Sequence, residues 1–146
     1  MEVDNSHLRG SQNPTITEKK DLAQLGISAS QGNAAAQVTL GDMYRDGNGV
    51  PRDDQAAFDW YLQAAEQGDS IGQIRLGKLY QYGQGVPQDY AQSLDWYLLA
   101  ANRGNIRAQR EIADFYYSGR GVTKDYAQAM VWYRKAADQG HAFAKK

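Results

Sequence analysis

The sequence predicts an all-α fold, a right-handed α-solenoid built from antiparallel helix pairs that repeat every 36 residues. One phrase occurs three times at that interval, as DWYLQAAEQG from Asp59, DWYLLAANRG from Asp95 and VWYRKAADQG from Val131. Within each copy the apolar residues follow the spacing of one helix face. A fixed period between about 20 and 50 residues is the signature of stacked repeats.

The register divides the chain into a head, three units and a tail. The three units are 32–67, 68–103 and 104–139. Residues 18–31 align with the second half of a unit but are more polar, which predicts an N-terminal capping helix. Residues 1–17 hold few aliphatic side chains and are expected to be disordered. Residues 140–146 are expected to start another helix, which is either truncated or a short cap.

Each unit predicts a first and a second helix joined by a short turn. The turn reads GNGVPRD, GQGVPQD and GRGVTKD in the three copies. Its first glycine suits a left-handed helix cap, and its aspartate suits the start of the second helix. Its valine can close the seam between the helices. Gly68, Gly104 and Gly140 are expected to end the second helices.

The recurring tryptophans are expected to fill the interior between units. Trp60, Trp96 and Trp132 are too large to be buried within two helices. Glycine inside a helix costs about 1 kcal/mol relative to alanine, yet it recurs at 41 and 77, with Ala113 as the third copy. We therefore expect close helix contact there, and an interior that no single unit could build alone.

The repeated string Ala-x-x-x-Leu-Gly-x-x-Tyr-x-x-Gly-x-Gly-Val-x-x-Asp, followed by Trp-Tyr-x-x-Ala-Ala-x-x-Gly, resembles the Sel-one-like repeat, a relative of the tetratricopeptide repeat. The resemblance covers residues 32–139. The third copy departs from it, with Ile112-Ala113 in place of Leu-Gly and Thr123 in place of proline. The resemblance implies that the first helices line the concave side of the superhelix.

Positions of the first helices that lie off the apolar stripe differ between the copies, and they form the candidate binding surface. Arginine, tyrosine and exposed apolar side chains supply most of the energy of protein interfaces. For any single position, a solvated helix residue is the alternative interpretation. The candidate residues are Asp42, Arg45, Ile71, Ile74, Arg75, Lys78, Tyr82, Arg107, Arg110, Asp114 and Tyr117.

Catalytic, cofactor and metal sites are not expected. The chain has no cysteine, and its histidines, His7 and His141, lie near opposite ends. The turn at 46–54 resembles a calcium loop in its first two ligand positions, but Val50 and Pro51 do not fit, so a turn is favoured. The Trp-Tyr pairs are interpreted as core rather than as stacking platforms. Three recurring glutamines, Gln37, Gln73 and Gln109, are expected to hydrogen-bond a neighbouring backbone.

Charge and hydropathy limit the partners. The net charge is -1, which gives no general attraction to nucleic acid, and no stretch is apolar enough for a membrane span. Acidic residues dominate the first unit and basic residues the third, a gradient that would favour weak head-to-tail self-association. The N-terminus lacks the features of a signal peptide, which predicts a cytoplasmic protein unless a signal was removed.

The sequence therefore predicts a non-enzymatic scaffold or adaptor that binds a protein or peptide on its concave face. One alternative is a structural repeat segment of a longer multidomain protein. Another is a hydrolase of the β-lactam type, since some cysteine-rich secreted proteins of the resembled family have been associated with that activity. The absence of cysteine and of a nucleophile–base pair in the sequence argues against the hydrolase.

Overall fold

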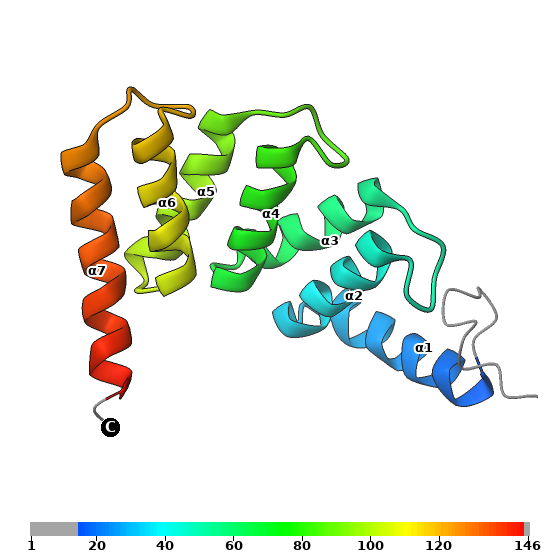
Figure 1. The fold of residues 1–146 in the computed structure, drawn as a ribbon. Helices are drawn as coiled ribbons and strands as arrows, with labels where there is room; N and C mark the ends of the chain where they lie inside the picture. The colour runs from blue at the N-terminus through cyan, green and yellow to red at the C-terminus, as the bar shows by residue number, and fades with distance from the viewer. Residues whose placement is uncertain (1–14, 145–146) are drawn as a thin grey trace, which may run out of the picture.

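The chain folds into a row of antiparallel helices that follow one another along an arc (Figure 1). The computed structural model describes the backbone of residues 15–144 and the side chains of residues 15–140. Its helices are α1 (Ile16–Ser30), α2 (Ala34–Asp46), α3 (Asp54–Glu66), α4 (Ser70–Tyr82), α5 (Tyr90–Asn102), α6 (Ile106–Ser118) and α7 (Tyr126–Ala144). The predicted all-α class is confirmed. Among these helices, none has the length and apolar character needed to cross a bilayer.

Contacts are densest within three helix pairs, α2–α3, α4–α5 and α6–α7, which are the predicted repeat units. The turn inside each pair has the predicted chemistry. Gly47 is left-handed, with φ of 67°, and its N–H donates to the carbonyl of Met43. The carboxylate of Asp53 then accepts from the N–H of Ala56 at 3.0 Å. Asp89 and Asp125 start the second helices of the later pairs in the same way.

The expectation that Gly140 ends a helix is wrong, because α7 continues through it to Ala144. The residue after each earlier glycine explains the difference. Asn33, Asp69 and Asn105 each accept a backbone N–H at the start of the next helix. The fourth copy has histidine at that position, 141, and therefore lacks the aspartate or asparagine cap that starts a new helix.

The N-terminal boundary also needs correction. Residues 15–17 were expected to be disordered, but Thr15 caps α1, and Ile16 and Thr17 belong to the helix. The Thr15 hydroxyl accepts from the N–H of Glu18, and the Glu18 carboxylate accepts from the N–H of Thr15. This is a capping box, whose Thr-x-x-Glu signature is legible in the sequence. The rest of the segment expected to be disordered, 1–14, lies outside the described residues.

The fully buried aromatic residues are two tyrosines and Phe115 rather than the tryptophans. Tyr61 and Tyr97 have no exposed surface. Trp60, Trp96 and Trp132 are partly buried, and each packs against the cluster shared with the preceding helices. The tryptophans thus contact the neighbouring unit as expected, but they pack against the outside of its buried cluster and stay partly exposed. The tyrosine fits better inside because its ring is smaller and its hydroxyl reaches a polar acceptor.

The glycines of the first helices make room for these tyrosine rings. A Cβ added to Gly77 would lie 2.7 Å from a ring carbon of Tyr97, and a Cβ on Gly41 would overlap Tyr61 in the same way. The close helix contact predicted at positions 41 and 77 is therefore confirmed. The group that fills the space is the tyrosine of the same unit.

The three recurring glutamines join each first helix to the helix before it. Their side-chain nitrogens donate to backbone carbonyls near the end of the preceding second helix, as predicted. Gln37 donates to Ala29 at 3.0 Å, and two later copies, Gln73 and Gln109, donate to Ala65 and Ala101 at 3.3 Å. Each of these carbonyls also accepts from the N–H of the glycine at the end of its helix, so the glutamine adds a second hydrogen bond that ties the two helices together.

Replacing Gly77 by alanine should destabilise the fold, although alanine is the better helix former. The added methyl overlaps a fully buried ring that cannot move aside, and such overpacking costs about 1–3 kcal/mol. Gly26 in α1 is the matched control, since a Cβ there meets nothing within 4 Å. Gly26→Ala should raise the free energy of unfolding by up to about 1 kcal/mol. Urea unfolding measures both changes, and equal shifts of the same sign would contradict the packing described.

Candidate interaction surface

Most of the predicted binding residues are exposed or half-exposed on α2, α4 and α6. We call the part formed by Asp42, Arg45, Arg75, Lys78, Tyr82, Arg107 and Asp114 the first-helix surface. Asp42, Arg45 and Arg75 are joined by ion pairs. Lys78 has Arg75 and Arg107 as charged neighbours. These contacts bring residues of all three first helices together.

Other predicted residues lie at the margins of this surface. Ile71 is 50% exposed and lies beside the α3–α4 turn, where it lines a shallow hollow with Arg103. Tyr117 packs its ring 5.0 Å from that of Tyr126, at the α6–α7 turn. Ile71 and Tyr117 are therefore exposed, at the two turns rather than beside Lys78.

Ile74 was predicted to bind a partner, and this is wrong because its side chain is 3% exposed. It belongs to a cluster with Leu94 and Phe115 of the next helices. Position 38 behaves alike, since Val38 packs against residues of the following first helix. The same position in the third unit is Arg110, which is exposed. This position therefore faces the next unit, and Arg110 lies toward the end of the row.

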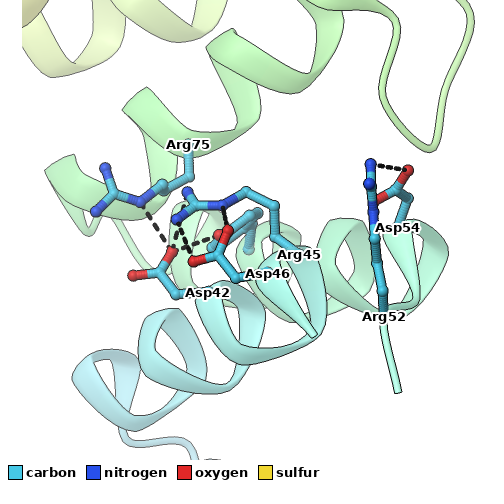
Figure 2. A network of polar contacts seen from close by, with 7 residues as sticks. Asp42, Arg45, Asp46, Arg52, Asp54 and Arg75 are labelled. Carbon is cyan, nitrogen blue, oxygen red and sulfur yellow. Dashed lines mark hydrogen bonds and ion pairs between the residues drawn. The ribbon is translucent and has the colours of Figure 1, made fainter. Parts of the chain in front are cut away.

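A polar network links the first two units through Asp42 (Figure 2). Asp42 in α2 accepts from Nε of Arg75 in α4 at 3.0 Å and from the hydroxyl of Tyr61 in α3. Arg45 approaches Asp42 at 3.4 Å and makes two hydrogen bonds to Asp46, at 2.9 and 3.0 Å. One carboxylate thus receives groups from three helices.

The titration of these groups follows their surroundings. Burial and the hydrogen bond to Asp42 raise the pKa of Tyr61 above its usual range. The hydrogen bond from Arg45 lowers the pKa of Asp46, and the same bond raises the pKa of Arg45. Near neutral pH, Arg45 and Asp46 are therefore charged, and Tyr61 is a neutral hydrogen-bond donor.

Each unit supplies an acceptor for the hydroxyl of its core tyrosine, but not from the same position. Tyr61 donates to Asp42, and Tyr133 donates to Asp114, which is the equivalent residue of the third unit. In the second unit this position holds Lys78, which cannot accept. Tyr97 donates instead to the side-chain oxygen of Gln81 at 2.8 Å.

Lys78 and Glu111 are charged groups held in a partly desolvated place. Burial lowers the pKa of Lys78, and the neighbouring Arg107 lowers it further. Burial raises the pKa of Glu111, and Asp114 adds to that shift. Glu111 was not among the predicted binding residues. Its place could have been found in the sequence, because it is the third-unit equivalent of Arg75.

A second hollow, of about 500 Å³, lies between α1, α2 and α3. Gly26 of α1 lines it together with Tyr44 and Trp60. The positions equivalent to Gly26 hold Leu62 and Leu98, which pack against the clusters of their own units. The hollow thus reflects a missing side chain in the capping helix. Within the described part of the chain, no three side chains are grouped as they would be to hold a metal ion.

Removing the Asp42 carboxylate should cost more stability than removing the Arg75 guanidinium. Asp42→Ala leaves the hydroxyl of the buried Tyr61 without its acceptor, at a cost of about 1–3 kcal/mol. Arg75→Ala removes a partly exposed ion pair worth about 0–1 kcal/mol. Adding Tyr61→Phe to Asp42→Ala should restore part of the loss. Thermal unfolding tests this order, and an equal cost for the two single variants would contradict it.

Comparison with known proteins agrees with this architecture. A family model described as Sel1 repeat matches three consecutive stretches, 34–69, 70–105 and 106–141. Among curated proteins, none matches the chain. The chain is similar to c5321, a protective antigen present in uropathogenic Escherichia coli strains and displaying an SLR fold, with 44% identity and a TM-score of 0.80. That match covers 82% of this chain and 26% of the other.

Two further solved structures share the architecture. A Sel1 repeat protein from Oxalobacter formigenes is 34% identical, with a TM-score of 0.77, over 83% of this chain and 49% of that one. Helicobacter pylori cysteine rich protein B is 22% identical, with a TM-score of 0.66, over 86% and 92%; this likeness concerns the fold alone. The chain spans about a quarter and a half of the first two relatives. The three matched repeats, in register with the helix pairs, establish that the chain belongs to the Sel1 repeat family.

Proposed function

We propose that the chain is a scaffold that binds a segment of another protein along the first-helix surface. Sel1 repeat proteins commonly mediate protein–protein interactions and are generally non-enzymatic. What is proposed for this chain in particular is the binding face. The observation that carries it is Tyr82, which is 63% exposed on α4 one helical turn after Lys78. Lys78 and its charged neighbour Arg107 make no ion pair with any described residue.

The chemistry of this face supports binding. Tyrosine and arginine side chains, here the exposed Tyr82 and Arg107, are among the groups that contribute most to interfaces. Neither Tyr82 nor Arg107 belongs to the buried clusters, so packing within the fold does not explain them. Direct contact between α2 and α4 supports placing the first helices on the inner side of the arc. A concave face of this kind suits an extended or helical peptide.

Peptides selected from a random displayed library against the whole chain should bind at the first-helix surface. A double variant, Tyr82→Ala with Arg107→Ala, should weaken the selected peptides by tenfold or more while leaving the unfolding temperature nearly unchanged, since both side chains are exposed. Met130→Ala is the control, because Met130 is 56% exposed on α7, away from this surface. Fluorescence anisotropy measures the affinities. Selected peptides that respond to Met130→Ala and ignore the double variant would place the binding site elsewhere.

A further inference from the structure

A charge reversal separates the second unit from its neighbours. The first and third units have an aspartate, Asp42 or Asp114, that accepts the hydroxyl of the core tyrosine. The second unit has Lys78 at this position. Replacing an acceptor by an ammonium group would leave the buried Tyr97 hydroxyl without a partner, which destabilises a fold. Gln81, itself 5% exposed, supplies the missing acceptor at 2.8 Å.

This compensation shows that the hydroxyl of Tyr97 does not depend on the residue at position 78. The lysine satisfies no buried group, and it forms no ion pair with residues 15–140. The fold accommodates it only because a second residue has taken over the structural role of the aspartate. The charge of Lys78 is not used in packing, and the equivalent positions of the first and third units hold aspartate. This combination points to an external ligand for Lys78.

The electrostatic environment of Lys78 indicates what kind of ligand fits. Burial and the cations Arg107 and Arg75 all disfavour the charge on Lys78, and only Glu111 among its closest charged neighbours favours it. Arg75 is already engaged by Asp42, whereas Arg107 is exposed. An anion placed between Lys78 and Arg107 would relieve this repulsion.

We propose that Lys78 and Arg107 bind carboxylates of an acidic segment in the partner protein. This inference rests on the function proposed above and names the chemistry of the partner. Acidic side chains lie beside the two cations, namely Glu111, a charged neighbour of both, and Asp114, a charged neighbour of Glu111. They would repel the continuous charge of a polyphosphate backbone, whereas a short acidic segment can place its carboxylates between them. Tyr82 is exposed close by for an apolar or aromatic neighbour of the acidic residues.

The decisive variant is Lys78→Asp, which gives the second unit the residue found in the first and third. The fold should tolerate it, because Asp is the native residue at both equivalent positions. Arg134→Asp is the matched control, since Arg134 is exposed on α7 and the change in net charge is identical. The probe is a fluorescein-labelled peptide of alternating glutamate and leucine, with the lysine–leucine counterpart as its charge-reversed control.

The glutamate peptide should bind the native chain, and the lysine peptide should not. Lys78→Asp should weaken binding at least tenfold, Lys78→Gln less, and Arg134→Asp less than twofold. Added salt should weaken the native complex, because salt screens the attraction between the peptide carboxylates and these surface cations. Equal losses in Lys78→Asp and Arg134→Asp would show a general charge effect and overturn the proposal.

Two outcomes separate this inference from the function on which it rests. Library-selected peptides that require Tyr82 but lack acidic residues, and bind Lys78→Asp with native affinity, would overturn the acidic partner and leave the binding face standing. A library that yields no peptide dependent on Tyr82 or Arg107 would overturn both. If Lys78→Asp unfolds more easily than the native chain, Lys78→Gln takes its place, and native affinity of Lys78→Gln for the glutamate peptide would overturn the acidic partner.

Discussion

The first two units depend on one contact, in which a tyrosine ring of the second helix packs directly on a glycine of the first. Because Gly41 and Gly77 have no side chain, the rings of Tyr61 and Tyr97 occupy the space between their helices. This contact sets how closely the two helices of a pair approach. It also places the tyrosine hydroxyl within hydrogen-bond distance of a side chain on the first helix. The cores of the first two units therefore end in a buried hydroxyl that needs an acceptor.

That need links the interior to the proposed binding surface. The acceptors are Asp42, Gln81 and Asp114, all on the first helices. A position that must accept a hydrogen bond is not free to vary with a partner's chemistry. In the second unit, Gln81 is the acceptor instead of the residue at position 78. Position 78 is therefore free to hold a residue that cannot accept a hydrogen bond, namely Lys78. Sequence variation on this surface therefore indicates binding residues only after the positions that accept a hydrogen bond from a core tyrosine have been excluded.

Much of the fold could be predicted because local chemistry repeats with the period. The turn glycines and the capping aspartates act within four residues, so three copies of the same signal suffice to recognise them. The assignment of the core was less accurate because helical spacing shows which residues share a face, and not what that face contacts. Ile74 lies beside the stripe of its own pair, yet it is buried by the pair that follows. The choice of tyrosine over tryptophan depended likewise on a hydroxyl partner that is distant in sequence.

The proposed site was harder to predict than the fold, for the same physical reason. The sequence indicated which positions differ between copies, and Lys78 and Arg107 are among them. It could not separate Arg75, which Asp42 already holds, from Lys78, which no described residue pairs with. It also could not show that Gln81 replaces the lost acceptor. Gln81 lies one turn beyond Lys78 on α4, and the hydroxyl that it accepts belongs to Tyr97 on α5. In the second unit, Lys78 differs from the equivalent residues of the other units, and Gln81 restores the hydrogen bond that this difference removes. A difference of this kind identifies a candidate binding residue better than sequence variation alone.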